Sequence, residues 1–367
     1  MSGTSLFNVE NSSKTRHEWF REYSSQRRDK LVDLCNLSNI ELQGYVKKSV
    51  LIDLLMERHK RGYRKKKVGE ATNEATNNTV APARRKTSLK RRVASRLTYP
   101  KQFSGSLDMK QGPRDYMEDT YVVAKYDDMT LYGVFDGHGG DEVSRLLPKL
   151  VSEGLLKGLP PHIRYQTGGV KNHISKTMYE IDHNLSKRDD AKEAGSTATM
   201  LLHIPPMAYL INIGDSRTLL AKKRQNGGYS LCKATVDHKP DQTQEYNRIV
   251  QTGGKVTHEI DDDARVDGVL AMSRAIGDHE LKYHTTQQQL PQYGPVSSHP
   301  DIYSVNLEKD GKYIAILASD GLWDVVDNDK ALKYSHHFGP ESAATPLTQY
   351  ALKNHSMDNI TTLVAML

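Results

Sequence analysis

Several apolar β-type runs in the second part of the chain are joined by very short connections. The run YVVAKY (121–126) is followed after four residues by LYGVFD (131–136), and AYLINIG (208–214) reaches RTLLAKK (217–223) through two residues. A parallel crossover needs a dozen or more residues, so connections this short join antiparallel neighbours. The sequence therefore predicts a mainly antiparallel sheet in which each of these pairs lies side by side.

Helical patterns occur between the β-type runs without the strict alternation of a βαβ protein. They cover residues 140–156, 170–187, 241–252, 327–336 and 341–354. Mixed elements of this kind predict an α+β body, which we place at residues 100–367.

The charge of the chain is divided unevenly between this body and the residues before it. Residues 1–99 hold 22 of the 51 Lys+Arg and 10 of the 45 Asp+Glu, a net charge of +12, which leaves 29 and 35, a net charge of −6, for residues 100–367. A basic arm on an acidic body predicts that the arm meets a polyanion or an import receptor while the body has a separate function.

We expect the arm to contain three parts. Residues 1–26 are polar and aperiodic and predict a flexible tail. Residues 27–67 predict a small basic helical hairpin, and residues 68–99 predict a disordered basic linker. No run approaches the roughly 18 apolar residues of a membrane span, and the first 30 residues lack an apolar signal core. We therefore expect no membrane association, a location in the nucleus, the cytoplasm or both, and a monomer.

Acidic residues stand at the ends of five apolar runs of the body. They are Glu118 and Asp119 before YVVAKY, Asp136 after LYGVF, Asp215 after INIG, Asp320 after YIAILAS, and Asp358 before NITTLVAML. Carboxylates gathered in one cleft would repel each other, and divalent cations relieve that repulsion. Oxygen ligands without a Cys/His cluster favour Mg²⁺ or Mn²⁺. The alternative is that each Asp-Gly pair is only a turn.

Eight blocks in this order resemble the motifs of the metal-dependent Ser/Thr protein phosphatases of the protein phosphatase 2C class. The blocks are RDYMEDT (114–120), GVFDGHGG (133–140), GSTATMLL (195–202), NIGDSRTLL (212–220), DHKPD (237–241), LAMSRAIGD (270–278), ASDGLWDVV (318–326) and DNITTLV (358–364). The resemblance covers about residues 100–367. It implies a four-layer αββα sandwich of two antiparallel sheets flanked by helices, with a two-metal centre in the cleft between the sheets.

The resemblance also implies roles for single residues. Asp136 resembles the carboxylate that bridges both metal ions, and the carbonyl of Gly137 a ligand of one of them. Asp320 and Asp358 resemble ligands of the other ion. The remaining matches are Glu118 and Asp119 as the pair that holds metal-bound water, Asp215 with Asp324 as a weak third-metal site, Arg114 as the phosphate-binding arginine, and His138 as the histidine that protonates the leaving oxygen. Residues 237–277 occupy the place of the family's flap beside the cleft.

These residue types suit hydrolysis of a phosphate ester. Two bound cations lower the pKa of water toward neutrality. Arg114 offers a planar fork for a phosphoryl group, and His138 can carry a proton near neutral pH. We therefore expect a signalling phosphatase that hydrolyses phosphoserine and phosphothreonine in phosphoproteins with water activated by two Mg²⁺ or Mn²⁺ ions. The alternative is a catalytically inactive pseudophosphatase or a binding protein tethered to nucleic acid.

Residues 31–62 of the arm are similar to the SAP-type helix-extended-helix module that binds DNA. If the module is present, the phosphate contacts would come from Lys47, Lys48, Arg61, Arg64, Lys65, Lys66 and Lys67. The alternative is a docking helix pair or a partly ordered arm. RGYRKKK (61–67) and RRKTSLKRR (84–92) are also typical of nuclear-import patches, with a solvated charge run as the alternative.

Overall fold

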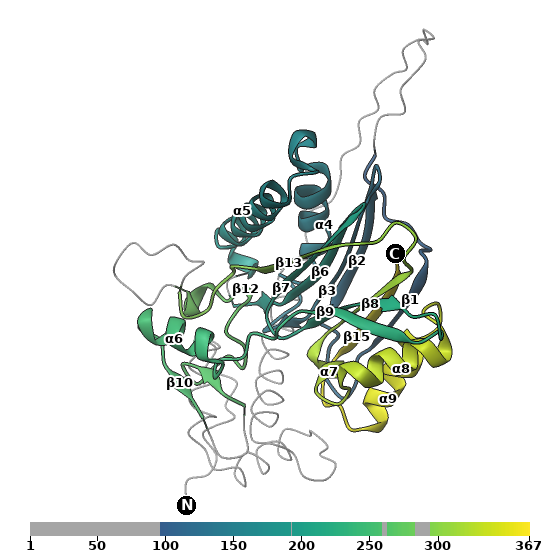
Figure 1. The fold of residues 1–367 in the computed structure, drawn as a ribbon. Coiled ribbons are helices and arrows are strands. Elements are labelled where there is room, and N and C mark those ends of the chain that lie inside the picture. Colours follow the sequence, from purple (N-terminus) through teal and green to yellow (C-terminus); the bar gives the residue numbers. More distant parts are fainter. Residues whose placement is uncertain (1–95, 192, 259–262, 283–293) are drawn as a thin grey trace, which may run out of the picture. The chain divides into compact units, whose positions relative to one another are not determined.

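The computed structural model describes residues 96–191, 193–258, 263–282 and 294–367. Residues 97–367 form one unit, separate from the residues before it. Within the described residues this unit contains two five-stranded antiparallel sheets with helices on their outer faces (Figure 1). The predicted tail, the helical hairpin and nearly all of the linker lie outside the described residues, so those predictions stay predictions.

The first sheet has the strand order β13-β7-β6-β3-β2, and all of its neighbours are antiparallel. Its strands are β2 (Thr120–Tyr126), β3 (Met129–Phe135), β6 (Ala198–Ile204), β7 (Met207–Ile213) and β13 (Asp301–Asn306). β2 and β3 form the predicted hairpin. Every residue of β3 is buried, which explains why its sequence is apolar without alternation.

The second sheet has the order β1-β15-β14-β8-β9 and is also antiparallel throughout. Its strands are β1 (Gly105–Lys110), β8 (Arg217–Lys223), β9 (Tyr229–Ala234), β14 (Tyr313–Ala318) and β15 (Ile360–Met366). The first and last described strands, β1 and β15, are paired here. Hydrogen bonds between β1 and β15 therefore join the beginning and the end of the described body within one sheet.

The prediction that 208–214 and 217–223 pair with each other was wrong. β7 belongs to the first sheet and β8 to the second, so the short connection between them crosses from one sheet to the other. Gly214 makes this turn with φ 99°, a conformation that favours glycine. A short connection excludes a parallel crossover, but it does not distinguish a hairpin from a step between two facing sheets.

Two small sheets complete the strand structure of the described residues. One has the order β12-β5-β4 and joins β4 (Gly137–His138), β5 (Gly195–Ser196) and β12 (Ile276–Gly277). The other pairs β10 (Val256–Thr257) with β11 (Arg265–Val266). The second lies in the segment expected to form the flap.

The described α-helices match the five predicted segments closely, with the largest difference in the first, except for one short helix directly after β14 that was not predicted. They are α4 (Leu147–Val151), which continues as the π-helix η1 (Ser152–Lys157), α5 (Thr167–Leu185), α6 (Thr243–Gln251), α7 (Asp320–Trp323), α8 (Asn328–Phe338) and α9 (Ala344–Lys353), with short 3₁₀ turns η2 (Pro161–Ile163), η3 (Asp189–Ala191) and η4 (His279–Leu281). In the described part of the chain, no helix combines the length and apolar character needed to cross a bilayer.

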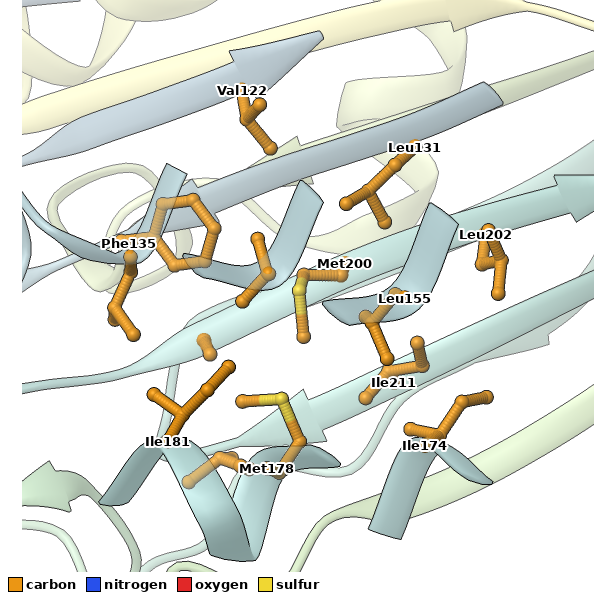
Figure 2. Close-up of a cluster of buried hydrophobic side chains, with 14 of the residues drawn as sticks. Val122, Leu131, Phe135, Leu155, Ile174, Met178, Ile181, Met200, Leu202 and Ile211 are labelled. Atoms are coloured by element: carbon orange, nitrogen blue, oxygen red, sulfur yellow. The ribbon is translucent and has the colours of Figure 1, made fainter. Parts of the chain in front are cut away.

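Three apolar clusters define the layers. In the first, Phe135 and Met200 of the first sheet pack against α4, η1 and α5 through Leu155 and Met178 (Figure 2). Because side chains alternate along a strand, Val134 points the other way. It belongs to a second cluster, which holds the two sheets together.

The third cluster covers the outer face of the second sheet. There Ile316 of β14 packs with Leu322 and Trp323 of α7 and with Leu347 of α9. The order of layers is therefore helix, sheet, sheet, helix. The predicted four-layer αββα sandwich is confirmed.

A candidate metal centre between the sheets

Strand pairing in the first sheet brings two of the predicted acidic residues to one edge. Thr120 of β2 is opposite Phe135 of β3, so Asp119, which precedes β2, lies next to Asp136, which follows β3. Thr197 fixes the backbone of Asp136: its hydroxyl accepts a hydrogen bond from the Asp136 N–H at 3.1 Å, and its own N–H donates to the Asp136 carbonyl at 2.9 Å.

The second sheet gathers three more carboxylates by the same rule. Ala318 near the end of β14 is opposite Thr362 of β15 and opposite Arg217 of β8. Asp320 follows β14, whereas Asp358 and Asp215 precede their strands. An antiparallel pair places the residue after one strand beside the residue before its neighbour, so these three acidic residues share one end of the sheet.

The two groups face each other, as their electrostatics show. Burial raises the pKa of Asp136 well above its usual value, and the charges of Asp119, Asp320, Asp358 and Asp215 raise it further. Burial also raises the pKa of Asp119 to about 7, with Asp358 adding to the effect. The strand ends therefore gather these carboxylates into one cluster, in which Asp119, Asp136 and Asp215 are buried and Asp358 is partly exposed.

The outer part of this cluster holds a lysine that the sequence analysis did not single out. Burial raises the pKa of Asp320 well above its usual value, and Asp215 and Asp324 raise it further. The ammonium of Lys239, from the DHKPD block, lies 2.6 Å from Asp215 Oδ2. Although burial lowers the pKa of Lys239, the Asp215 carboxylate raises it above its usual range. Lys239 therefore stays charged and offsets part of the repulsion around Asp215 and Asp324.

Two further residues that the sequence analysis missed tie the sheets together beside the cluster. Ser319 donates from its hydroxyl to Asp119 Oδ2 at 2.8 Å. Asn359 accepts from the Glu118 N–H at 2.7 Å and donates to the carbonyls of Gln111 and Tyr116 at 2.8 Å each. Ser319 directly precedes Asp320 in the ASDGLWDVV block, and Asn359 directly follows Asp358 in the DNITTLV block. This neighbourhood to a predicted acidic residue was the signal that the sequence offered for them.

Arg114 lies against the same end of the second sheet. Its Nη2 donates to Asp358 Oδ2 at 2.7 Å, and its Nε donates to the Met357 carbonyl at 3.2 Å. The structure thus brings the predicted phosphate-binding arginine to a predicted metal ligand. These two hydrogen bonds hold the guanidinium in a fixed direction.

Gly137 and His138 follow Asp136 directly and form β4. A Cβ at position 137 would lie 2.4 Å from the Glu118 carbonyl oxygen and 2.6 Å from Ser144 Oγ, so only glycine lets these backbones approach. Glu118 is thereby placed next to Gly137. His138 lies with its Nε2 2.6 Å from Asp278 Oδ2, and Asp278 had no assigned role in the sequence analysis.

The chemistry of this cluster fits divalent cations. Asp119, Asp215 and Asp320 each have a buried Oδ1 without a hydrogen-bond partner among the described residues, and a buried oxygen left without a donor is a typical position for an ion. All candidate ligands are oxygens, as Mg²⁺ and Mn²⁺ prefer. Within the described ranges, no three Asp, Glu, His or Cys side chains form a group that could hold a metal ion as they stand. The structure therefore places the carboxylates together without defining the number of ions.

The predicted nucleic-acid contacts are not part of this site. Lys47, Lys48, Arg61, Arg64, Lys65, Lys66 and Lys67 lie outside the described residues. The SAP-like arm therefore stays a prediction.

Comparison with known proteins agrees with this arrangement. The family model for protein phosphatase 2C matches residues 104–360. The chain is 37% identical over 261 residues to a probable protein phosphatase 2C 7 of Oryza sativa subsp. japonica, in an alignment that covers 69% of this chain and 63% of the relative. It is 36% identical over 270 residues to a probable protein phosphatase 2C 45 of the same organism, covering 72% and 87%. The chain spans between 48% and 63% of the length of three curated relatives that it matches, of which the probable protein phosphatase 2C 7 is one.

Solved structures show the same fold. A serine-threonine phosphatase 2C from Toxoplasma gondii superimposes with a TM-score of 0.61 at 23% identity, covering 74% of this chain and 98% of the other. A C. elegans sex determining protein superimposes with a TM-score of 0.58 at 18% identity, covering 98% and 84%. Together with the match over residues 104–360 and the carboxylate cluster at the strand ends, these similarities show that the chain belongs to the protein phosphatase 2C family.

Proposed function

We propose that this chain is a Mg²⁺- or Mn²⁺-dependent protein phosphatase that hydrolyses phosphoserine and phosphothreonine in proteins. The observation that carries the proposal is the largely buried carboxylate cluster of Asp119, Asp136, Asp215, Asp320 and Asp358, with Arg114 and His138 beside it. Such a concentration of carboxylates destabilises a fold unless it serves a bound cation. Membership of the protein phosphatase 2C family supports the same activity.

Asp136, Asp320 and Asp358, with the carbonyl of Gly137, would hold two divalent cations, and Glu118 with Asp119 would orient water beside them. Asp215 with Asp324 would form a weaker third site. When bound, the two cations neutralise phosphoryl charge and lower the pKa of a water molecule toward neutrality.

Arg114 would bind the phosphoryl group of the substrate. A guanidinium pairs with two phosphoryl oxygens at once, which a lysine does not. The hydrogen bonds to Asp358 and the Met357 carbonyl hold the Arg114 side chain in a fixed direction, so little side-chain entropy is lost when substrate binds.

His138 would give a proton to the serine or threonine oxygen as the phosphorus–oxygen bond breaks. An alkoxide is a poor leaving group, and a positioned acid accelerates its departure by roughly 10²- to 10⁴-fold. His138 follows the proposed bridging carboxylate Asp136 by two residues, which places the proton donor beside the proposed metal centre.

The test is hydrolysis of a phosphothreonine peptide by the full chain with Mn²⁺, with and without chelator. We expect turnover that chelator abolishes and that Asp136→Asn reduces by at least about 10²-fold. Asp127→Asn serves as a matched control, because Asp127 lies in the turn at the opposite end of β3 from Asp136 and pairs there with Arg164 at 3.1 Å. Peptide binding without turnover would favour a pseudophosphatase, and turnover indifferent to chelator would refute the metal centre.

Mn²⁺ should also stabilise the fold, because a ligand that binds only the folded state raises the melting temperature. We expect this increase in wild type and in Asp127→Asn, and a smaller one in Asp320→Asn. An increase of equal size in Asp320→Asn would show that the ion binds elsewhere.

A further inference from the structure

One stretch of the acidic body carries only positive charge. Residues 217–234 contain no Asp or Glu and five basic residues: Arg217, Lys222, Lys223, Arg224 and Lys233. The rest of residues 100–367 is left with 24 Lys+Arg against 35 Asp+Glu. The stretch forms β8, β9 and the turn between them, and β9 is the last strand of the second sheet (Figure 1). This hairpin is therefore a basic surface on a body with an excess of acidic residues.

Most of this charge lies at the end of the hairpin that is far from the carboxylate cluster. In the register of the second sheet, Lys222 is opposite Tyr313 of β14, and Asp320 comes seven positions after Tyr313. Because a strand advances about 3.3 Å per residue, Lys222 and Asp320 are separated by roughly 20 Å along the sheet. The basic end of the hairpin is therefore not part of the candidate metal centre.

A hollow of about 520 Å³ opens at this end of the hairpin. Its lining residues are all basic or polar: Lys222, Lys223, Arg224, Gln225, Asn226 and Ser230. Lys223 and Arg224 are exposed. The Lys222 ammonium lies 2.5 Å from Glu308, in a pair whose side chains are 35% and 69% exposed. Such an exposed pair contributes little stability, so Lys222 can exchange Glu308 for another carboxylate. The hollow therefore has the charge to hold acidic side chains.

Backbone hydrogen bonds hold the basic residues of the hairpin in place. The Arg224 N–H donates to the Gly228 carbonyl at 2.7 Å, and the Gly227 N–H donates to the Arg224 carbonyl at 3.0 Å. The Lys223 N–H donates to the Lys312 carbonyl at 2.8 Å, which fixes the end of β8 beside the start of β14. The backbone is thus already ordered, and only side chains lose freedom when a ligand binds.

The edge of β9 is poorly suited to pairing with an added strand. Its register with β8 shifts between Leu220 and Ala221, which leaves Cys232 as the extra residue of a bulge. Lys233 of β9 places its ammonium 4.0 Å from the centre of the Tyr303 ring of β13. Bulges and lysines on an edge strand discourage further pairing. The hairpin therefore favours a ligand that is bound through charged side chains.

A short acidic stretch of polypeptide fits this surface better than nucleic acid does. The basic residues are confined to one hairpin, and Glu308 and Asp310 lie just beyond it in the connection from β13 to β14. A longer polyanion would extend over the acidic remainder of the body, where its phosphates would be repelled. A few consecutive Asp or Glu residues match the extent of the hollow without meeting that repulsion.

We infer that the hollow at the β8–β9 turn is a docking site for an acidic segment of a phosphoprotein substrate. A second contact of this kind raises the effective concentration of the phosphorylated residue at the carboxylate cluster. An extended peptide also advances about 3.3 Å per residue, so the acidic segment must lie at least about six residues from the phosphorylated one. The use of the site for substrates rests on the proposed phosphatase function, whereas the binding of an acidic segment does not.

The test compares the full wild-type chain in Mn²⁺ with the triple variant Lys222→Gln, Lys223→Gln and Arg224→Gln on three kinds of phosphothreonine peptide. The first carries a run of aspartates about ten residues from the phosphothreonine, on either side in separate peptides; the second carries the run about two residues away; the third has serines instead. In wild type we expect the first kind to have a KM at least about 5-fold below that of the third, and the second kind to show no such gain. The triple variant should lose this gain and keep the wild-type kcat and the wild-type turnover of phenyl phosphate.

The matched control is the triple variant Lys149→Gln, Lys157→Gln and Lys176→Gln. These lysines are also exposed, and they belong to α4, η1 and α5, which cover the first sheet. Their removal changes the net charge by the same amount at a different place, so we expect the wild-type KM for every peptide. The basic arm is present in all three proteins, so a difference between them reports on the hairpin.

Cross-linking with a carbodiimide, which joins carboxylates to lysine amines, gives a readout that does not need turnover. With the unphosphorylated aspartate peptide and the full chain, we expect mass spectrometry to find cross-links at Lys222 or Lys223 that exceed those at Lys149 and Lys157.

The outcomes separate the docking site from the proposed function. An unchanged KM gain in the hairpin variant, or no excess of cross-links at the hairpin, would overturn the inference while leaving the phosphatase function intact. Suppression of these cross-links by single-stranded DNA of equal charge at a lower concentration than by free peptide would assign the surface to nucleic acid and overturn the inference as well. Absence of any metal-dependent turnover in wild type would overturn the proposed function and, with it, the role of the hairpin in substrate docking.

Discussion

Glu245 should make the stability of the body depend on pH in a defined window. It lies in α6 with 3% exposure and accepts hydrogen bonds from Arg274 Nη2 at 2.5 Å, Arg248 Nη2 at 2.7 Å and the Ser273 hydroxyl at 2.6 Å. Although burial raises its pKa, Arg274 and Arg248 lower it from 4.5 to about 2. Arg274 also donates to Asp301 of β13 at 2.9 Å. Through Arg274, the Glu245 carboxylate therefore connects α6 to β13.

The magnitude follows from linkage between protonation and folding. A pKa that is lower in the folded state contributes stability that is fully present above the unfolded pKa of 4.5 and is lost as the pH falls through the folded pKa of about 2. A difference of 2.5 units is worth about 3 kcal/mol in all, of which about 2 kcal/mol should already be lost at pH 3.

Chemical unfolding of wild type and Glu245→Gln at pH 7, 5, 4 and 3 measures this contribution. Other carboxylates titrate in both proteins, so the difference between the two isolates Glu245. We expect the difference in unfolding free energy to be largest at pH 7 and to shrink by about 2 kcal/mol at pH 3. Glu180→Gln is the control, because Glu180 forms only an exposed pair with Lys176 at 3.7 Å, and such pairs contribute little. Parallel loss of stability in wild type and Glu245→Gln from pH 7 to pH 3 would refute the reasoning.

Two further predictions concern packing. Gly137→Ala should lower the unfolding free energy by about 1–3 kcal/mol, because the new Cβ would lie 2.4 Å from the Glu118 carbonyl oxygen. Gly168→Ala in α5 should leave the unfolding free energy unchanged or raise it, because a Cβ there meets nothing within 4 Å. Thermal melts of the two variants decide this, and equal melting temperatures would contradict it. Leu155→Ala should lower the unfolding free energy by about 2–5 kcal/mol, because Leu155 is fully buried between η1 and the first sheet. Leu352→Ala, at a position that is 37% exposed, should lower it far less. Urea unfolding of both variants is the measurement, and similar losses of unfolding free energy would show that the outer helical layer is loosely packed.

The candidate site could be located from the sequence because its residues mark strand ends. Asp136 and Asp320 each follow an apolar run directly, and Asp358 lies two residues before another. The local pattern of an apolar run and its terminal carboxylate does not depend on distant residues. The antiparallel character of the sheets follows in the same way from the short connections, since chain length alone excludes a parallel crossover.

Partners across the fold could not be predicted this way. Lys239 meets Asp215 beyond the β8–β9 hairpin, Asn359 meets Glu118 between the two large sheets, and Asp278 meets His138 across β5. None of these contacts follows from one short segment. No local signal separates these residues from others in the same motifs, because polar side chains at a turn look alike whether they face solvent or a buried carboxylate.

Sequence by itself determined the α+β class, the antiparallel character of the strands and the carboxylates at their ends, because each depends on a few neighbouring residues. Tertiary structure alone decided which strands share a sheet, as β7 and β8 show by passing from one sheet to the other through two residues. It also decided which charge is compensated by which partner. Hydrogen bonds and ion pairs between facing sheets depend on how whole layers pack against each other. The free energy of that packing depends on residues from many segments, so no short segment of the chain predicts it.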